Sequence, residues 1–176
     1  SRSLCYPSPT TMTIAFVQHA VSPASPPRVD RGVRAVQAAA DAGADLVVFP
    51  ELSFTSFYPR VPVAERDRSA LDLAEPVPGP TTEALATAAA DGGVVVVFNL
   101  MERDGDRTFD TSPVLNADGT LLGRTRMMHI TAYENFHEQG YYAPGDTGAP
   151  VYDTAAGRIG VAVCYDRHYP EYLRAL

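Results

Sequence analysis

Residues 30–50, DRGVRAVQAAADAGADLVVFP, hold a helix pattern followed directly by a strand pattern. Asp30 is a suitable N-cap, apolar residues recur at helical spacing up to about Ala42, and Gly43 is a typical helix stop. Leu46–Phe49 is a short, wholly apolar run, which predicts a strand with both faces buried. A buried strand next to a helix is typical of α/β proteins, in which helices cover the sheet.

The same pattern of short apolar runs continues on both sides of this stretch. Five further strands are predicted: Met12–Gln18, Val94–Leu100, Phe109–Leu115, Thr120–Met128 and Ile159–Val163. The sequence Asn116–Gly119 between two of them is a hairpin signal, so the sheet should be mixed. Thr81 or Thr82 should cap a second helix that runs to about Asp91, and Pro170 should begin a third.

The composition is that of one ordinary globular domain. The 176 residues are 45% hydrophobic and 20% charged, which excludes a disordered or collagen-like chain. A net charge of −7 argues against nucleic acid as a partner, and no apolar run nears the ~20 residues that span a membrane. Cys5 and Cys164 lack the spacing of a metal site. We expect a cytoplasmic protein in which residues 1–11 form a disordered N-terminal extension.

Three reactive side chains lie at or beside predicted strand ends. Glu51 follows the strand Leu46–Phe49, Cys164 follows the strand Ile159–Val163, and Glu138 lies in a polar loop. Ligands of α/β sheets bind at the carboxyl ends of strands. A thiol needs a base to become nucleophilic, and a carboxylate whose pKa is raised by burial can take that proton. These residues predict an acyl-transfer site, although a buried core thiol beside exposed acidic caps would leave the same pattern.

Four segments of the chain carry motifs in a recognisable order and spacing. They are Phe49–Leu52, Gly123–Ile130, Glu138–Asp146 and Gly160–Glu171. Together they resemble the nitrilase, or carbon–nitrogen hydrolase, superfamily over about Met12–Leu176. The resemblance implies the family's α-β-β-α sandwich, with residues 12–176 as one hydrolase domain. Because the family's domain is longer, it also implies a C-terminally incomplete chain, with about the first half to two-thirds of the sandwich present.

The resemblance implies a role for each reactive side chain. Glu51 would be the general base, Cys164 the nucleophile that forms a thioester acyl-enzyme, and Glu138 a second glutamate that supports the site. The backbone N–H of Tyr165 could donate to the oxyanion. The implied substrates are small non-peptide amides or N-carbamoyl compounds. The resemblance implies no organic cofactor and no metal, and the implied assembly is a homo-oligomer.

One position departs from the family pattern. The family has a lysine just before the Met-His-Ile-type segment, where this chain has Met127, and all fourteen basic residues of the chain are arginine. The lysine stabilises the oxyanion, and loss of one such donor costs about 3–4 kcal/mol, or 10²–10³-fold in rate. Arg126 is no obvious substitute, since adjacent strand residues point to opposite faces. The alternative to an active enzyme is therefore a catalytically impaired or inactive, nitrilase-like binding or assembly protein.

Three further side chains are candidates for substrate binding. Arg167, close to the cysteine, could bind a substrate carboxylate in bidentate fashion, as in relatives that act on N-carbamoyl amino acids. An internal ion pair of Arg167 with Asp166 or Glu171 is the alternative. Tyr58 and Phe136 could form a pocket wall, although aromatic packing is the commoner explanation.

Overall fold

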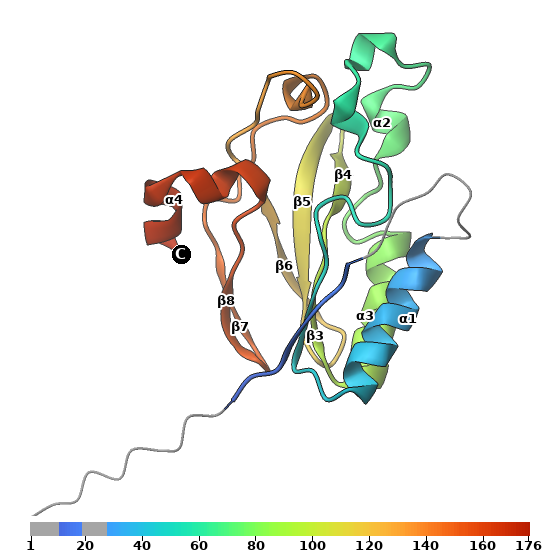
Figure 1. Cartoon of the computed structure of the whole chain (residues 1–176), viewed down its shortest axis with the longest axis vertical. Coiled ribbons are helices and arrows are strands. Elements are labelled where there is room, and N and C mark those ends of the chain that lie inside the picture. Colours follow the sequence, from blue (N-terminus) through green and yellow to red (C-terminus); the bar gives the residue numbers. More distant parts are fainter. Residues whose placement is uncertain (1–10, 19–27) are drawn as a thin grey trace, which may run out of the picture.

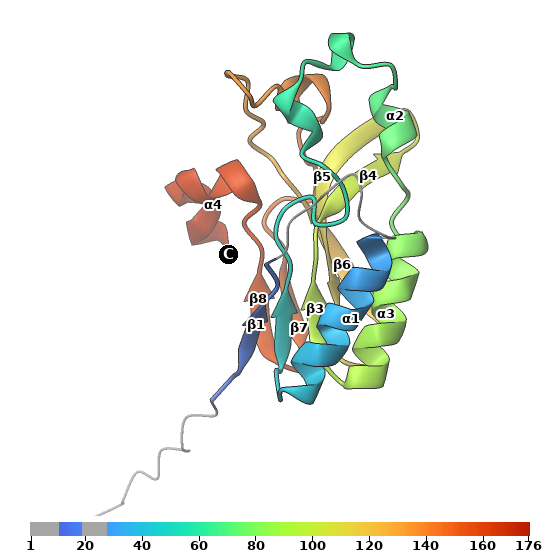
Figure 2. The same cartoon turned by 45° about the vertical axis from the view of Figure 1, so that its right-hand side comes forward.

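The computed structural model describes residues 11–18 and 28–176. Within them, two long helices lie side by side on one face of a six-stranded sheet, and a two-stranded hairpin lies on the other face (Figures 1 and 2). The helices are α1 (Arg28–Asp41) and α3 (Pro80–Gly92), and the hairpin pairs β7 (Val151–Thr154) with β8 (Gly157–Gly160). The predicted extension over residues 1–11 falls, except for Thr11, outside the described residues.

The main sheet is mixed, as the hairpin signal predicts. Its strands are β1 (Ile14–Phe16), β2 (Leu46–Val48), β3 (Val95–Val97), β4 (Leu100–Asp104), β5 (Arg107–Leu115) and β6 (Leu121–Arg126). Strands β1, β2 and β3 run parallel, and β5 pairs antiparallel with β3, β4 and β6. The predicted β5–β6 hairpin closes through Asn116, whose backbone N donates to the Thr120 carbonyl over 2.8 Å.

Alternate residues of the central strands face two different layers. Val47 and Val96 are fully buried against α1 and α3. Leu46 and Val95 point the other way and pack in a cluster with Tyr152 of the β7–β8 hairpin. Because both faces of the sheet are covered at β2 and β3, these two strands are continuous apolar runs with no polar alternation.

Two predicted strands are less buried than expected. β1 is shorter than the predicted Met12–Gln18 and lies at the edge of the sheet, where 76% of Phe16 is exposed. β8 spans Gly157–Gly160, earlier than the predicted Ile159–Val163, and it pairs with β7 outside the main sheet. The prediction of two buried strands was wrong because apolar composition does not distinguish a central strand from an edge strand.

The other elements differ from prediction mainly at their ends. Helix α3 begins at Pro80 with Gly79 as its N-cap, and the Thr81 hydroxyl binds the Glu75 carboxylate instead of capping the helix. The predicted strand Val94–Leu100 divides into β3 and β4. A short helix α2 (Ala70–Leu73) precedes α3, and α4 (Pro170–Ala175) begins at the predicted proline. Among the described residues, every helix is too short or too polar to cross a lipid bilayer.

Candidate active site

Glu51 lies just beyond the carboxyl end of β2, in the turn that leads away from the sheet. The turn is tight, with Leu52 at φ 48°. The Leu52 backbone N–H donates to Asn99 Oδ1 over 2.7 Å. Asn99 lies in the short connection between β3 and β4. A buried side-chain amide therefore anchors the backbone that carries Glu51.

Cys164 opens a short 3₁₀ helix, Cys164–His168, which follows the β7–β8 hairpin. Its backbone has φ 45°, the left-handed region that a residue with a Cβ rarely adopts. Such a conformation costs on the order of 1–3 kcal/mol and is found most often at functional sites. The thiol is partly buried and packs against the apolar cluster that contains Leu52, Tyr141 and Val163.

Glu138 begins a second 3₁₀ helix, Glu138–Gly140, and its side chain is completely buried. Its Oε2 accepts hydrogen bonds from the Thr131 hydroxyl over 2.6 Å and from the Thr131 backbone N–H over 3.2 Å. Its Oε1 has no hydrogen-bond partner among the described residues. This oxygen is therefore available to a ligand or a proton.

The three predicted reactive groups converge in space. One carboxylate oxygen from each of Glu51 and Glu138 and the Cys164 Sγ all lie within 4.8 Å of one another. The alternative of a core thiol beside exposed acidic caps does not describe this geometry, because Glu138 is buried and Glu51 is half-buried beside the thiol. Loops from three distant parts of the chain thus bring two acids and a nucleophile together.

Sequence reasoning missed a fourth polar residue, Asp110 on β5. It is completely buried, and its Oδ1 accepts a hydrogen bond of 2.5 Å from Asn99 Nδ2. The Glu51 carboxyl lies close enough to Asp110 to raise the pKa of Asp110. The sequence feature that could have identified Asp110 is its place inside the predicted buried strand Phe109–Leu115. An acid that is buried usually has a hydrogen-bond partner or a functional role.

The electrostatics of the cluster favour neutral groups. Burial raises the pKa of Asp110 well above its usual range, and the nearby Glu51 carboxyl raises it further. Burial likewise raises the pKa of Glu138 and of the Cys164 thiol, and the charges of Glu51, Glu138 and Asp110 add to the shift at Cys164. The resting thiol is therefore protonated near neutral pH. It needs a base at the moment of attack.

Met127 is fully buried in the apolar cluster against which Cys164 packs. Its backbone N–H donates to the Asp110 carbonyl over 2.9 Å, so its position beside the site is fixed by β5. Besides burial, the groups that shift the pKa values of Asp110, Glu138 and Cys164 are carboxyl groups, Thr131 and the Asn99 amide. In the part of the chain that the structure describes, none of these groups is an arginine.

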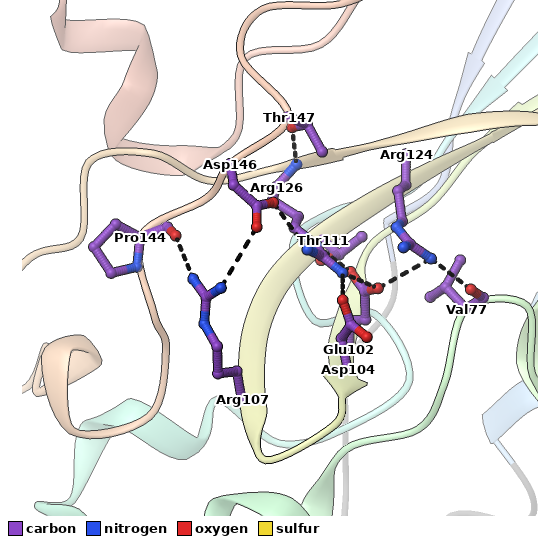
Figure 3. A network of polar contacts seen from close by, with 10 residues as sticks. All are labelled: Val77, Glu102, Asp104, Arg107, Thr111, Arg124, Arg126, Pro144, Asp146 and Thr147. Carbon is purple, nitrogen blue, oxygen red and sulfur yellow. Dashed lines mark hydrogen bonds and ion pairs between the residues drawn. The ribbon is translucent and has the colours of Figure 1, made fainter.

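Arg126 belongs to a separate network of polar contacts (Figure 3). Its guanidinium makes hydrogen bonds to both carboxylate oxygens of Glu102, at 2.6 and 2.9 Å, and to Asp104 and Asp146 at 2.8 Å each. It also lies 3.8 Å from the centroid of the Phe109 ring. As the strand alternation predicts, Arg126 does not replace the missing lysine.

The predicted substrate-binding residues are dispersed. The exposed Arg167 donates to the Cys164 carbonyl over 2.7 Å, and neither of the suggested acidic partners binds it: Asp166 binds His129, and Glu171 pairs with Arg174. Tyr58 is buried in the apolar cluster. Tyr165 follows the nucleophile within the same 3₁₀ helix.

A cavity of about 670 Å³ opens beside Glu51, whereas Glu138 and Cys164 are not among its lining residues. Phe136 and Phe57 form part of its wall, with their rings 5.4 Å apart, and Glu51 lines it. Arg60 also lines the cavity, and sequence reasoning did not single it out. The cavity is large enough for a small amide, and its wall joins an acid, an arginine and two aromatic rings.

A family model, curated relatives and solved structures all match this chain. A family model described as carbon-nitrogen hydrolase matches residues 13–176. The chain is 33% identical over 166 residues to N-carbamoylputrescine amidase from Solanum lycopersicum, a match that covers 94% of this chain and 54% of that protein. The crystal structure of a carbon-nitrogen hydrolase from Helicobacter pylori G27 matches with a TM-score of 0.83 and 26% identity, over 94% of this chain and 56% of that one.

A further match is a mutant amidase from Nesterenkonia sp. AN1 that shows covalent addition of the acetamide moiety of fluoroacetamide at the active site cysteine. That structure has a TM-score of 0.72 and 25% identity, and the match covers 93% of this chain and 59% of that chain. The chain spans about half the length of the curated relatives it matches.

Proposed function

Because the chain belongs to the carbon–nitrogen hydrolase family of the nitrilase superfamily, we propose that it hydrolyses small non-peptide amides or N-carbamoyl compounds. Cys164 is the proposed nucleophile, Glu51 the general base and Glu138 the supporting acid. The observation that carries this proposal is the convergence of one reactive atom from each of these three residues within 4.8 Å. The amidase relatives support the choice of amide-type substrates.

The proposed reaction starts with proton transfer from the Cys164 thiol to the Glu51 carboxylate. The resulting thiolate attacks the substrate carbonyl carbon, and the backbone N–H of Tyr165 donates to the developing oxyanion. As the C–N bond breaks, the leaving nitrogen takes the proton from Glu51 and departs as ammonia or an amine. Glu51 then removes a proton from water, and the hydroxide attacks the thioester carbonyl. The C–S bond breaks, the acyl group leaves as an acid, and the Cys164 thiolate takes the proton back from Glu51.

A substrate panel tests this proposal directly. We expect release of ammonia or amine from simple amides or N-carbamoyl compounds, and Cys164→Ala should abolish it because no thioester can form. Cys5→Ala is the matched control, since it removes the other cysteine of the chain. Turnover that survives Cys164→Ala, or is lost equally in Cys5→Ala, would contradict the proposed nucleophile.

A second candidate is a binding or assembly protein with little or no hydrolytic activity. The buried methionine at position 127 favours it, because a thioether provides neither a charge nor an N–H donor for the oxyanion. This candidate predicts that ligands bind to the 670 Å³ cavity without being consumed. Measurable turnover by the wild-type protein that depends on Cys164 excludes it.

Two arginines could select substrates that carry a carboxylate. Arg60 lines the cavity with Glu51, and Arg167 is tied to the carbonyl of Cys164. We propose paired assays with an N-carbamoyl acid and a neutral amide. Arg167→Gln should raise KM for the acid alone if Arg167 holds the carboxylate, and Arg60→Gln should do so if Arg60 holds it. Unchanged KM values in both variants would exclude carboxylate recognition by either residue.

A further inference from the structure

We propose that Asp110 is a positioning residue: its carboxylic acid keeps a proton and donates it in a hydrogen bond to the carboxylate of Glu51. The inference rests on the proposed function, in which Glu51 is the base. Two observations carry it. Asp110 Oδ2 and Glu51 Oε1 are both buried oxygens with no hydrogen-bond partner among the described residues. The Glu51 carboxyl also lies close enough to raise the pKa of Asp110. Two carboxyl oxygens can bond to each other only through a shared proton.

The geometry indicates which group holds the proton. Asp110 is completely buried within the sheet, whereas Glu51 is half-buried and lines the cavity. Burial disfavours the charged form, so the shared proton is assigned to Asp110, the more deeply buried partner. The other oxygen of Asp110 is bound by Asn99 Nδ2, which leaves the protonated oxygen free for Glu51.

The same amide closes the network. Asn99 Oδ1 accepts from the backbone N–H of Leu52, the residue after Glu51, while Asn99 Nδ2 donates to Asp110. Asn99 therefore holds the Glu51 backbone through one atom and the Glu51 side chain, by way of Asp110, through another. Such an arrangement locks the orientation of a carboxylate that would otherwise move freely in its turn.

Among the described residues, none of the titratable groups that act on Asp110 is a cation that could favour its charged form. The titratable groups that act on it or respond to it are Glu51 after β2, Glu138 and Tyr142 in the loop after β6, and Cys164 at the start of its 3₁₀ helix. Every one of them is neutral or acidic. Met127 carries no charge, so it could not compensate a second negative charge if Asp110 ionised beside Glu51. The proton therefore stays on Asp110.

Infrared spectroscopy of the full-length protein, labelled with carboxyl-¹³C aspartate, tests the protonation state without any turnover. We expect a protonated-carboxyl stretch at pH 7 in the wild type, its loss in Asp110→Asn, and its retention in the control Asp153→Asn, which changes an exposed aspartate of β7. Absence of the band at pH 7, or its persistence in Asp110→Asn, would overturn the inference. Because no substrate is involved, this result is independent of the proposed function.

Activity assays then test positioning. Asn has a permanently neutral N–H donor, so Asp110→Asn should exceed Asp110→Ala in kcat by about tenfold or more, the value of a hydrogen bond to a charged group. The wild type should lose activity at alkaline pH as Asp110 ionises and repels Glu51, and Asp110→Asn should lack this loss. If the two variants have equal kcat and the same alkaline limb as the wild type, Asp110 does not position Glu51.

Discussion

Replacing Met127 by lysine would add a cation in the apolar cluster against which Cys164 packs. Met127 is 0% exposed, its backbone binds Asp110, and its side chain lies in the apolar cluster beside Cys164. The lysine stem can occupy the apolar volume of the methionine, while its ammonium extends toward Glu51 and Glu138. Those acids would stabilise the charge, so we expect the variant to fold.

The expected magnitude follows from the roles of the groups around the new cation. An added oxyanion donor in a dry site lowers the barrier by about 3–4 kcal/mol, so kcat should rise by about 10²–10³-fold. The ammonium also opposes the charge of Glu51, which raises the pKa of the Cys164 thiol. The apparent pKa of that thiol should therefore fall.

Ammonia release and the pH dependence of Cys164 alkylation by iodoacetamide measure the two effects separately. Met128→Lys is the matched control, because it adds the same charge at the next residue, whose side chain is 36% exposed. A folded Met127→Lys protein that is no faster than the wild type, with an unchanged alkylation profile, would refute the electrostatic reasoning.

Three further predictions concern charge and burial. Glu51→Gln should lower the pKa of the Cys164 thiol by removing the nearest charge, so alkylation at pH 8 becomes faster while hydrolysis is lost; slower alkylation would contradict this. Asp110→Asn should become more stable than the wild type as pH rises. Because the folded-state pKa of Asp110 lies above its unfolded value, the wild type loses about 1.4 kcal/mol per pH unit between the two, which urea unfolding at several pH values would detect. Arg126→Met should destabilise the fold by about 3–5 kcal/mol in urea, since Glu102 is 1% exposed and would be left without its main partner; Arg158→Met, on an exposed pair, should have little effect, and equal effects would contradict the prediction.

Much of the architecture follows from local patterns. The helix signal over residues 30–42 corresponds to α1, the turn at Asn116–Gly119 corresponds to the β5–β6 hairpin, and Pro170 begins α4. The sandwich implied by the family resemblance is confirmed by the likeness to solved carbon–nitrogen hydrolases. These patterns consist of the spacing of apolar, capping and turn residues within a single helix, strand or hairpin. They can therefore be recognised from the sequence alone.

Local patterns did not predict which side chains are buried or which residues they bind, because both depend on contacts between distant segments. Phe16 was expected in a buried strand and lies exposed at a sheet edge. Asp110 was not identified from the sequence, although it is fully buried and the Glu51 carboxyl raises its pKa. Arg167 does not form the ion pairs suggested for it; its guanidinium instead donates a hydrogen bond to the Cys164 carbonyl. Each of these outcomes depends on which segment packs beside the residue, and residues distant in the chain decide that.

The amino-acid sequence marked Glu51, Glu138 and Cys164 as candidate reactive groups, because chemical type and position along the chain are properties of the sequence. The family resemblance marked Met127 as the position where a lysine is expected. The folded arrangement alone decided that these three groups converge, that Arg126 turns away to Glu102, and that Asp110 joins Glu51. The physical reason is that hydrogen bonds and charge interactions act over a few ångströms of space. That distance exists between these residues only after the sheet and its connecting loops have packed.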